Sequence, residues 1–128
     1  MIHCRTRDEI EKMRRSGRVV REILTELGGM IKPGVTALEL EEVAEKRIQE
    51  ARGIPAFKGY RGYPNCSCVS VNEQIIHGIP SSRQFKEGDI VSLDLGVVID
   101  GYYGDSALTI PVGNIPEPVQ KLLKVTEE

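Results

Sequence analysis

The dipeptide Asp100-Gly101 is the feature that most constrains what this chain can fold into. It separates two runs rich in Val, Ile, Tyr and Thr. Asp-Gly between such runs is the strongest short-range signal for a two-residue β-hairpin, because both turn positions need positive φ. A turn here fixes the register of both strands and places Asp94 opposite Ala107. Asp105 then lies opposite Gly96, so the two aspartates are diagonal neighbours.

Both aspartates are predicted to project from the same face of the hairpin, since side chains alternate faces along a strand. Diagonal neighbours have β-carbons within roughly 7 to 8 Å, and small Gly96 leaves room opposite Asp105. Two carboxylates this close repel each other unless water screens them, they share a proton or they hold a cation. The pair therefore indicates either a divalent metal site or an ordinary solvent-facing strand surface, and by itself it leaves both open.

Length and composition predict one globular domain that spans residues 1–128. The chain has 40% hydrophobic and 28% charged residues, which argues against the disordered and membrane-spanning classes. Its 17 basic and 19 acidic residues give no electrostatic footprint for nucleic acid. The first residues lack the apolar stretch of a secretory signal, so we expect a cytoplasmic protein without a membrane partner.

Two amphipathic helices are predicted ahead of the sheet. Each begins with the Thr-x-x-Glu pattern of a capping box, at residues 6–9 and at residues 36–39. We expect the first helix to end at Gly28-Gly29 and the second before Gly53, because glycine accepts the left-handed conformation that closes a helix. The fold class predicted from this order of elements is α+β, with helices packed on an antiparallel sheet.

Further strands and a last helix are predicted around the hairpin. Strand signals occur at residues 68–71 and around Ile75-Ile76. After the hairpin, a helix starts at Pro116 or Pro118 and carries no stop signal before the sequence ends. We therefore expect the chain to be truncated after residue 128 and to continue in a longer protein.

Residues 53–65 are too rich in Gly and Pro for regular structure and are predicted to form a loop. The loop carries Phe57, Tyr60 and Tyr63, half of the six aromatic residues of the chain. Such rings either pack down on a core or line a pocket. Without further information the two interpretations are equal.

The three cysteines do not predict a disulfide scaffold, because their number is odd and their spacing matches no usual zinc or redox motif. Cys66 and Cys68 stand at alternate positions of a predicted strand and so share one face. Small buried thiols are common at such positions. Packing is therefore the favoured interpretation, and metal binding is the alternative.

Several of these motifs together closely resemble type I methionine aminopeptidases of bacteria. They are the aromatic loop, the run Ser70-Val-Asn-Glu-Gln-Ile-Ile-His-Gly-Ile-Pro80, Lys86-Glu-Gly-Asp89, and Asp94 followed by Asp-Gly-Tyr-Tyr-Gly-Asp105. The match runs from the first helix to Val112. The resemblance implies half of a pita-bread fold, in which two pseudo-symmetric halves enclose a dinuclear metal site.

The resemblance also implies roles for individual residues. Asp94 would bind one metal ion through both oxygens and Asp105 would bridge two ions, with Co, Mn, Fe or Zn as candidate metals. His77 would contact the substrate near the scissile amide and stabilise the tetrahedral intermediate. Without the resemblance, the sequence favours a histidine whose ring hydrogen-bonds the backbone of a turn. The pocket for the methionine side chain would be walled by Phe57, Tyr60, Tyr63 and Cys68, with Phe57 replacing a cysteine of some relatives.

The family completes its site with residues that this sequence lacks. They are a histidine and two glutamates from the second half and another histidine that assists catalysis, whereas His3 and His77 are the only histidines here. We therefore expect an aminopeptidase, a metal-dependent hydrolase and protease, that removes the amino-terminal methionine of nascent proteins and peptides, with this chain supplying part of the site. The alternatives are a homodimer around a shared metal pair, and a non-catalytic module that binds peptide amino termini.

Overall fold

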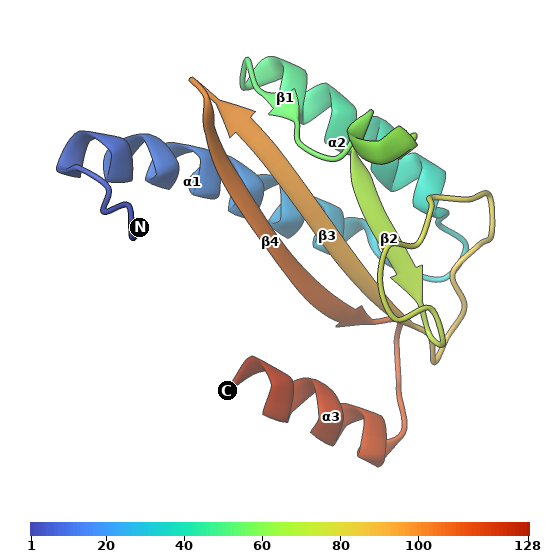
Figure 1. The fold of residues 1–128 in the computed structure, drawn as a ribbon. Coiled ribbons are helices and arrows are strands. Elements are labelled where there is room, and N and C mark those ends of the chain that lie inside the picture. Colours follow the sequence, from blue (N-terminus) through green and yellow to red (C-terminus); the bar gives the residue numbers. More distant parts are fainter.

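The structure is a computed structural model that describes all 128 residues, and it confirms the α+β class (Figure 1). Two helices cover one face of a four-stranded antiparallel sheet, and a third helix stands apart from this layer. In chain order the elements are α1 (Arg7–Met30), α2 (Ala37–Glu50), β1 (Ile54–Pro55), a short 3-10 helix η1 (Tyr60–Gly62), β2 (Ser67–Val71), β3 (Ile90–Ile99), β4 (Tyr102–Pro111) and α3 (Glu117–Glu127).

The hairpin of β3 and β4 has the predicted turn and register. Asp100 and Gly101 have φ of 52° and 82°, as a two-residue turn of this kind requires. Asp94 pairs with Ala107, as predicted. Asp105 pairs with Gly96, which confirms the diagonal arrangement of the two aspartates. Strand β3 is central, because β4 pairs along one of its sides while β2 and β1 share the other.

Both predicted capping boxes are formed, but the predicted end of the first helix is wrong. The Thr6 and Thr36 hydroxyls each accept a backbone N–H three residues later, from Glu9 and Glu39. Helix α1 continues through Gly28-Gly29 to Met30. The physical reason is packing, since a β-carbon at position 28 would lie 2.7 Å from Cδ1 of Ile110 on β4. Here glycine allows a helix and a strand to approach rather than ending the helix.

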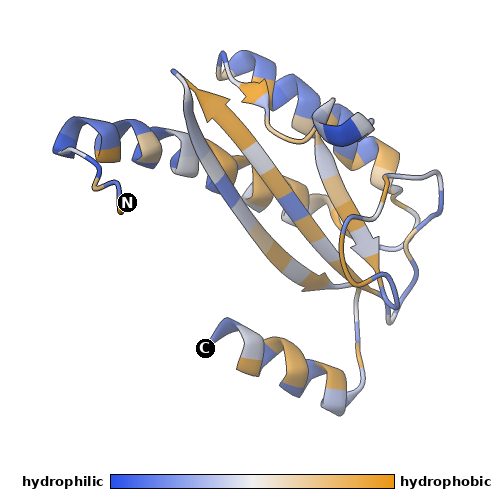
Figure 2. Ribbon diagram, viewed as in Figure 1, coloured by the Kyte–Doolittle hydropathy of each residue, from blue (hydrophilic) through white to orange (hydrophobic).

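The hydrophobic core lies between the two packed helices and the sheet. Alternate residues of β3 point into it, and Figure 2 shows the resulting bands of hydrophobic and hydrophilic residues along that strand. This matches the predicted period of two. The largest fully buried side chains are Phe85, Leu27, Leu40, Ile48, Leu93, Leu95, Val20, Val69, Val91, Val97, Val112 and Cys66. No helix is both long enough and apolar enough to cross a membrane.

Two predictions for the segment between α2 and β3 need correction. The loop at residues 53–65 contains the short strand β1 and the helix η1, so it is not wholly irregular. The strand predicted around Ile75-Ile76 is absent, and these side chains are 85% and 67% exposed. The chain turns away from the sheet at Asn72, whose φ is 54°, so the β-branched residues that follow have no strand to pair with.

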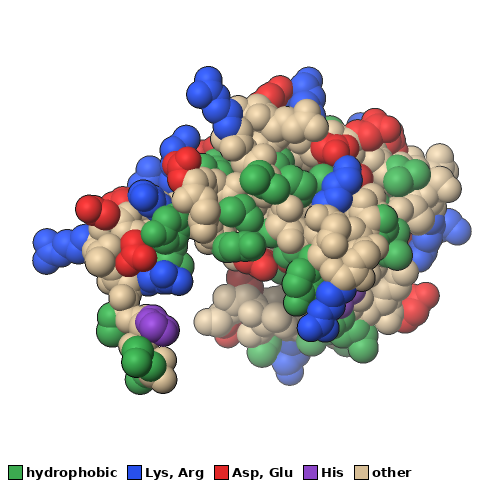
Figure 3. All heavy atoms as spheres, turned by 45° about the horizontal axis from the view of Figure 1, so that its top comes forward, with side chains coloured by type: hydrophobic (Ala, Val, Ile, Leu, Met, Phe, Trp, Pro, Cys, Tyr) green, Lys and Arg blue, Asp and Glu red, His purple; other side chains and the backbone are tan.

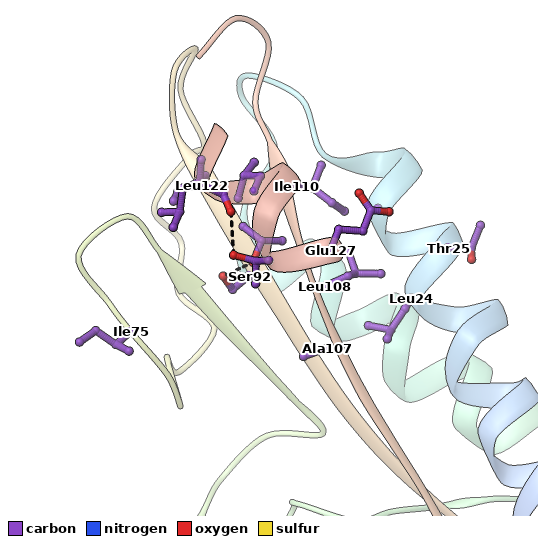
Figure 4. A pocket seen from close by; sticks show the side chains of 14 residues that line it. Leu24, Thr25, Ile75, Ser92, Ala107, Leu108, Ile110, Leu122 and Glu127 are labelled. Atoms are coloured by element: carbon purple, nitrogen blue, oxygen red, sulfur yellow. Dashed lines mark hydrogen bonds between the residues drawn. The ribbon is translucent and has the colours of Figure 1, made fainter. Parts of the chain in front are cut away.

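Helix α3 begins at Glu117, next to the predicted start at Pro116 or Pro118, and does not pack closely against any other helix or strand. Its Leu122 and Val125 are 59% and 61% exposed, and a hollow of about 860 Å³ separates it from α1 and β4 (Figure 4). Strand β4 has a partner on one side only. Positive and negative side chains are mixed over the face of the molecule shown in Figure 3.

Candidate functional site

One hollow of about 650 Å³ brings together every residue to which the family resemblance assigned a role. It lies on the sheet face opposite the packed helices, where the aromatic loop, β2 and the turn at residue 77 meet the hairpin. The residues that line it are Phe57, Tyr60, Arg61, Gly62, Tyr63, Pro64, Cys68, His77, Ile79, Asp94 and Asp105. The geometry is thus that of a single site, while the role of each residue stays a prediction.

The two aspartates lie on one face at the floor of this hollow. Asp94 is partly buried and Asp105 is exposed. Burial, first, and then the negative charge of Asp105 raise the pKa of Asp94, while the nearby His77 opposes the shift. A raised pKa means that the folded chain resists ionising Asp94. A cation between the two carboxylates would remove that resistance.

The space opposite Asp105 is filled, which corrects one expectation. Gly96 was expected to leave room there, but a β-carbon at this position would lie 2.7 Å from Cε1 of Phe57 and 2.9 Å from Cβ of Ala56. The absent side chain therefore makes room for the Phe57 ring and not for a ligand. Phe57 lies against the central strand and forms one wall of the site.

Tyr63 turns its hydroxyl away from the solvent. The hydroxyl donates to the carbonyl oxygens of Ser67 at 2.9 Å and Gly78 at 3.1 Å. Burial, first, and the neighbouring Cys68 hold the pKa of Tyr63 well above its usual range. The ring of Tyr63 lines the hollow, whereas Tyr60 is 65% exposed at its mouth.

The buried carboxylate of Glu41 supports the site from α2, a role that the sequence analysis did not predict. It accepts the backbone N–H of Cys66 at 2.5 Å, the N–H of Ser67 at 3.0 Å and the Ser67 hydroxyl at 2.6 Å. These bonds fix the start of β2, whose next residue is Cys68. Glu41 therefore positions one wall of the hollow without lining it.

The structure agrees with the packing interpretation of Cys66 and Cys68, but the prediction that they share one face is wrong. Cys66 precedes β2 and belongs to the hydrophobic core with Val69, whereas Cys68 faces the hollow. Cys66 and Cys68 are both buried, and Cys68 also lines the hollow. Burial, first, together with the Glu41 carboxylate raises the pKa of Cys66 to about 12. Burial likewise raises the pKa of Cys68. Both thiols therefore stay protonated at neutral pH and react slowly.

Alkylation by iodoacetamide should distinguish the three thiols. In the folded chain at neutral pH we expect one modification, at exposed Cys4, with Cys66 and Cys68 modified only after unfolding in urea. Mass spectrometry of tryptic peptides after timed quenching would measure this order. Modification of Cys68 as fast as Cys4 would contradict the burial described above.

The donor set fits a divalent metal ion only in part. Carboxylate oxygens suit such ions, and Asp94 and Asp105 line the same hollow from one face of the hairpin. Yet no group of three or more His, Cys, Asp or Glu side chains in this chain is arranged to hold a metal ion. Asp94 and Asp105 would therefore be two ligands of a site whose others come from elsewhere.

Comparison with known proteins gives the same picture over the whole chain. Methionine aminopeptidase 1 of Bacillus subtilis is 52% identical over 128 residues, which are 100% of this chain and 52% of that one. The crystal structure of the methionine aminopeptidase of Thermotoga maritima matches with a TM-score of 0.96 at 46% identity, and that of the Rickettsia prowazekii enzyme with 0.96 at 35%. Each of these two structural matches covers 99% of this chain and 51% of the matched chain.

These matches confirm the resemblance inferred from the motifs and the half pita-bread fold. The chain spans about half the length of the relatives it matches. The family model for metallopeptidase family M24 matches residues 11–128, which include both aspartates, His77 and the aromatic loop. This chain therefore belongs to metallopeptidase family M24.

Proposed function

We propose that this chain supplies half of the active site of a methionine aminopeptidase, which removes the amino-terminal methionine from nascent proteins and peptides. The observation that carries the proposal is the meeting of Asp94, Asp105 and His77 with an aromatic wall in one hollow. The names of relatives that are 40 to 52% identical support it. Action on nascent proteins implies a cytoplasmic location.

The two aspartates would hold the metal ions. Asp94 and Asp105 would be the carboxylate ligands that this chain contributes, with Co, Mn, Fe or Zn as candidate metals. When bound, divalent ions supply Lewis-acid activation of the scissile carbonyl and of the attacking water. The missing ligands would come from the rest of a longer protein.

The aromatic hollow would hold the methionine side chain. Its walls at Phe57, Tyr63 and Cys68 are largely apolar and partly or fully buried, which suits an unbranched thioether, and sulfur makes favourable contacts with aromatic rings. Tyr60 would close the outer side. His77 would lie beside the scissile amide and donate a hydrogen bond to the tetrahedral intermediate.

Metal uptake by the chain tests the role of the aspartate pair. We expect calorimetric titration with MnCl2 or CoCl2 to show binding by the wild-type chain and none by the double variant Asp94→Asn, Asp105→Asn, because both carboxylates converge on one place. Asp100→Asn is the matched control, since it removes a charge from the same hairpin at the turn, outside the hollow. Equal metal uptake by the double variant and the wild type would contradict the assignment of Asp94 and Asp105 as metal ligands.

Activity needs a complete site, so it is tested in a chimera. Replacing the matched segment of the Bacillus subtilis relative, 52% of that protein, with this chain should give an enzyme that releases methionine from a short peptide. The same chimera with Asp94→Asn should be inactive, while the chimera with Asp100→Asn should keep its activity. The isolated chain should release no methionine, and release by it would contradict the claim that it supplies only part of the site.

A further inference from the structure

A set of buried contacts clamps the backbone next to His77. The N–H of Gly78 donates to the Ser70 hydroxyl at 3.0 Å. The carbonyl oxygen of Gly78 accepts hydrogen bonds from the N–H of Val69 at 2.9 Å and from the hydroxyl of Tyr63 at 3.1 Å. Gly78 is therefore tied to β2 on one side and to the aromatic loop on the other.

The clamp leaves the backbone no room for another path. A β-carbon at Gly78 would lie 2.3 Å from the carbonyl oxygen of Val69 and 2.9 Å from the α-carbon of Ser70. The preceding residue, His77, has φ of 58°, a left-handed conformation that few residues other than glycine adopt. Such a conformation persists only where the surroundings determine it, and here the contacts of Gly78 do so.

The side chain of His77, by contrast, is exposed, and no hydrogen bond to the rest of the chain holds its ring. The backbone beneath it therefore fixes where the side chain leaves the chain and which positions the imidazole can reach. Ser70 is 3% exposed and pairs with Ser92 on β3, the strand that carries Asp94. It accepts from Gly78, and it does not line the hollow.

We propose that Ser70 is a positioning residue for His77, with the Tyr63 hydroxyl as a second support. By fixing Gly78, the Ser70 hydroxyl keeps the backbone of His77 at the hollow, so that the imidazole can reach the space beside Asp94. This role rests on the function proposed above, where the imidazole acts on the substrate. It also gives Tyr63 two tasks, because its ring lines the hollow while its hydroxyl holds the histidine turn.

Nuclear magnetic resonance of the isotope-labelled chain tests the proposal without metal or peptide. In Ser70→Ala we expect the Gly78 amide to exchange with solvent about tenfold faster, as the loss of a buried hydrogen bond implies. The imidazole signals of His77 should shift at constant pH. The chain has only two histidines, so His3 in the exposed amino-terminal segment is an internal reference that should not change. Ser70→Thr keeps the hydroxyl and should restore both signals.

Ser67→Ala is the matched control, because it removes another buried β2 hydroxyl, one that donates to Glu41 rather than accepting from Gly78. Its Gly78 exchange should stay at the wild-type rate. Unchanged Gly78 exchange and His77 signals in Ser70→Ala would overturn the proposal, as would equal acceleration along β2 in both alanine variants. If the aspartates bind no metal, the function proposed above fails. The Gly78 exchange rate and the His77 imidazole resonances still decide whether Ser70 positions His77.

Discussion

Replacing Glu41 with alanine should lower the free energy of unfolding by about 3 kcal/mol or more. The Glu41 carboxylate is 7% exposed and accepts two backbone N–H groups, those of Cys66 and Ser67, and one hydroxyl. Alanine would leave the two N–H groups buried without an acceptor, at about 1 to 3 kcal/mol each. The buried Ser67 hydroxyl would lose its acceptor as well.

Urea denaturation of three variants would measure this effect. Glu42→Ala is the matched control, because Glu42 is the exposed neighbour on the same helix, and its cost should stay within about 0.5 kcal/mol. Glu41→Gln keeps one acceptor oxygen and should fall between the two. If Glu41→Ala and Glu42→Ala were equally stable, the buried bonds to β2 would have no net value. The loss should also loosen the hollow, since Cys68 follows the segment that Glu41 holds.

The hairpin and its register could be predicted from sequence because the information is local. The turn chemistry of Asp100-Gly101 fixes the pairing, and the period of two then assigns a face to every residue of β3 and β4. Both aspartates were placed correctly by these two rules alone. Local rules also gave both capping boxes, whose partners are three residues apart.

Contacts between distant segments could not be predicted in this way. Glu41 bonds residues 25 and 26 positions later, and the Phe57 ring occupies the space at Gly96 from another part of the chain. One signal for Glu41 was present, because with Ala37 and Ala44 it follows the helical spacing of four and three on the buried face. An acid at a core position predicts a buried hydrogen-bonding partner.

The metal-free chain is expected to lose stability as pH rises through the range where Asp94 ionises. Burial and the charge of Asp105 raise the pKa of Asp94 above its ordinary value of 3.8. An acid with a higher pKa in the folded state binds more protons when folded, so its stabilising contribution is complete below the ordinary value. That contribution disappears as pH climbs through the raised value. Asp94→Asn should remove this part of the pH dependence.

Asp89 contributes to the pH dependence of stability with the opposite sign. Burial raises its pKa, but hydrogen bonds from Asn72 and from the Lys86 N–H, with the charge of Arg83, outweigh burial and lower it. Its contribution is therefore lost as pH falls. The difference between the wild type and Asp94→Asn, measured by thermal denaturation at a series of pH values, separates the effect of Asp94 from that of Asp89.

Divalent metal should reverse the sign of the Asp94 effect. A metal ion binds the ionised carboxylates, so its stabilisation grows as Asp94 loses its proton, reaching about 2.7 kcal/mol at a concentration one hundred times the dissociation constant. With Mn²⁺ present, the wild-type chain should therefore gain stability over the same pH range in which the metal-free chain loses it. Asp94→Asn should show neither the loss nor the gain. The same pH dependence in both proteins, with and without Mn²⁺, would mean that the two carboxyls do not act as a pair.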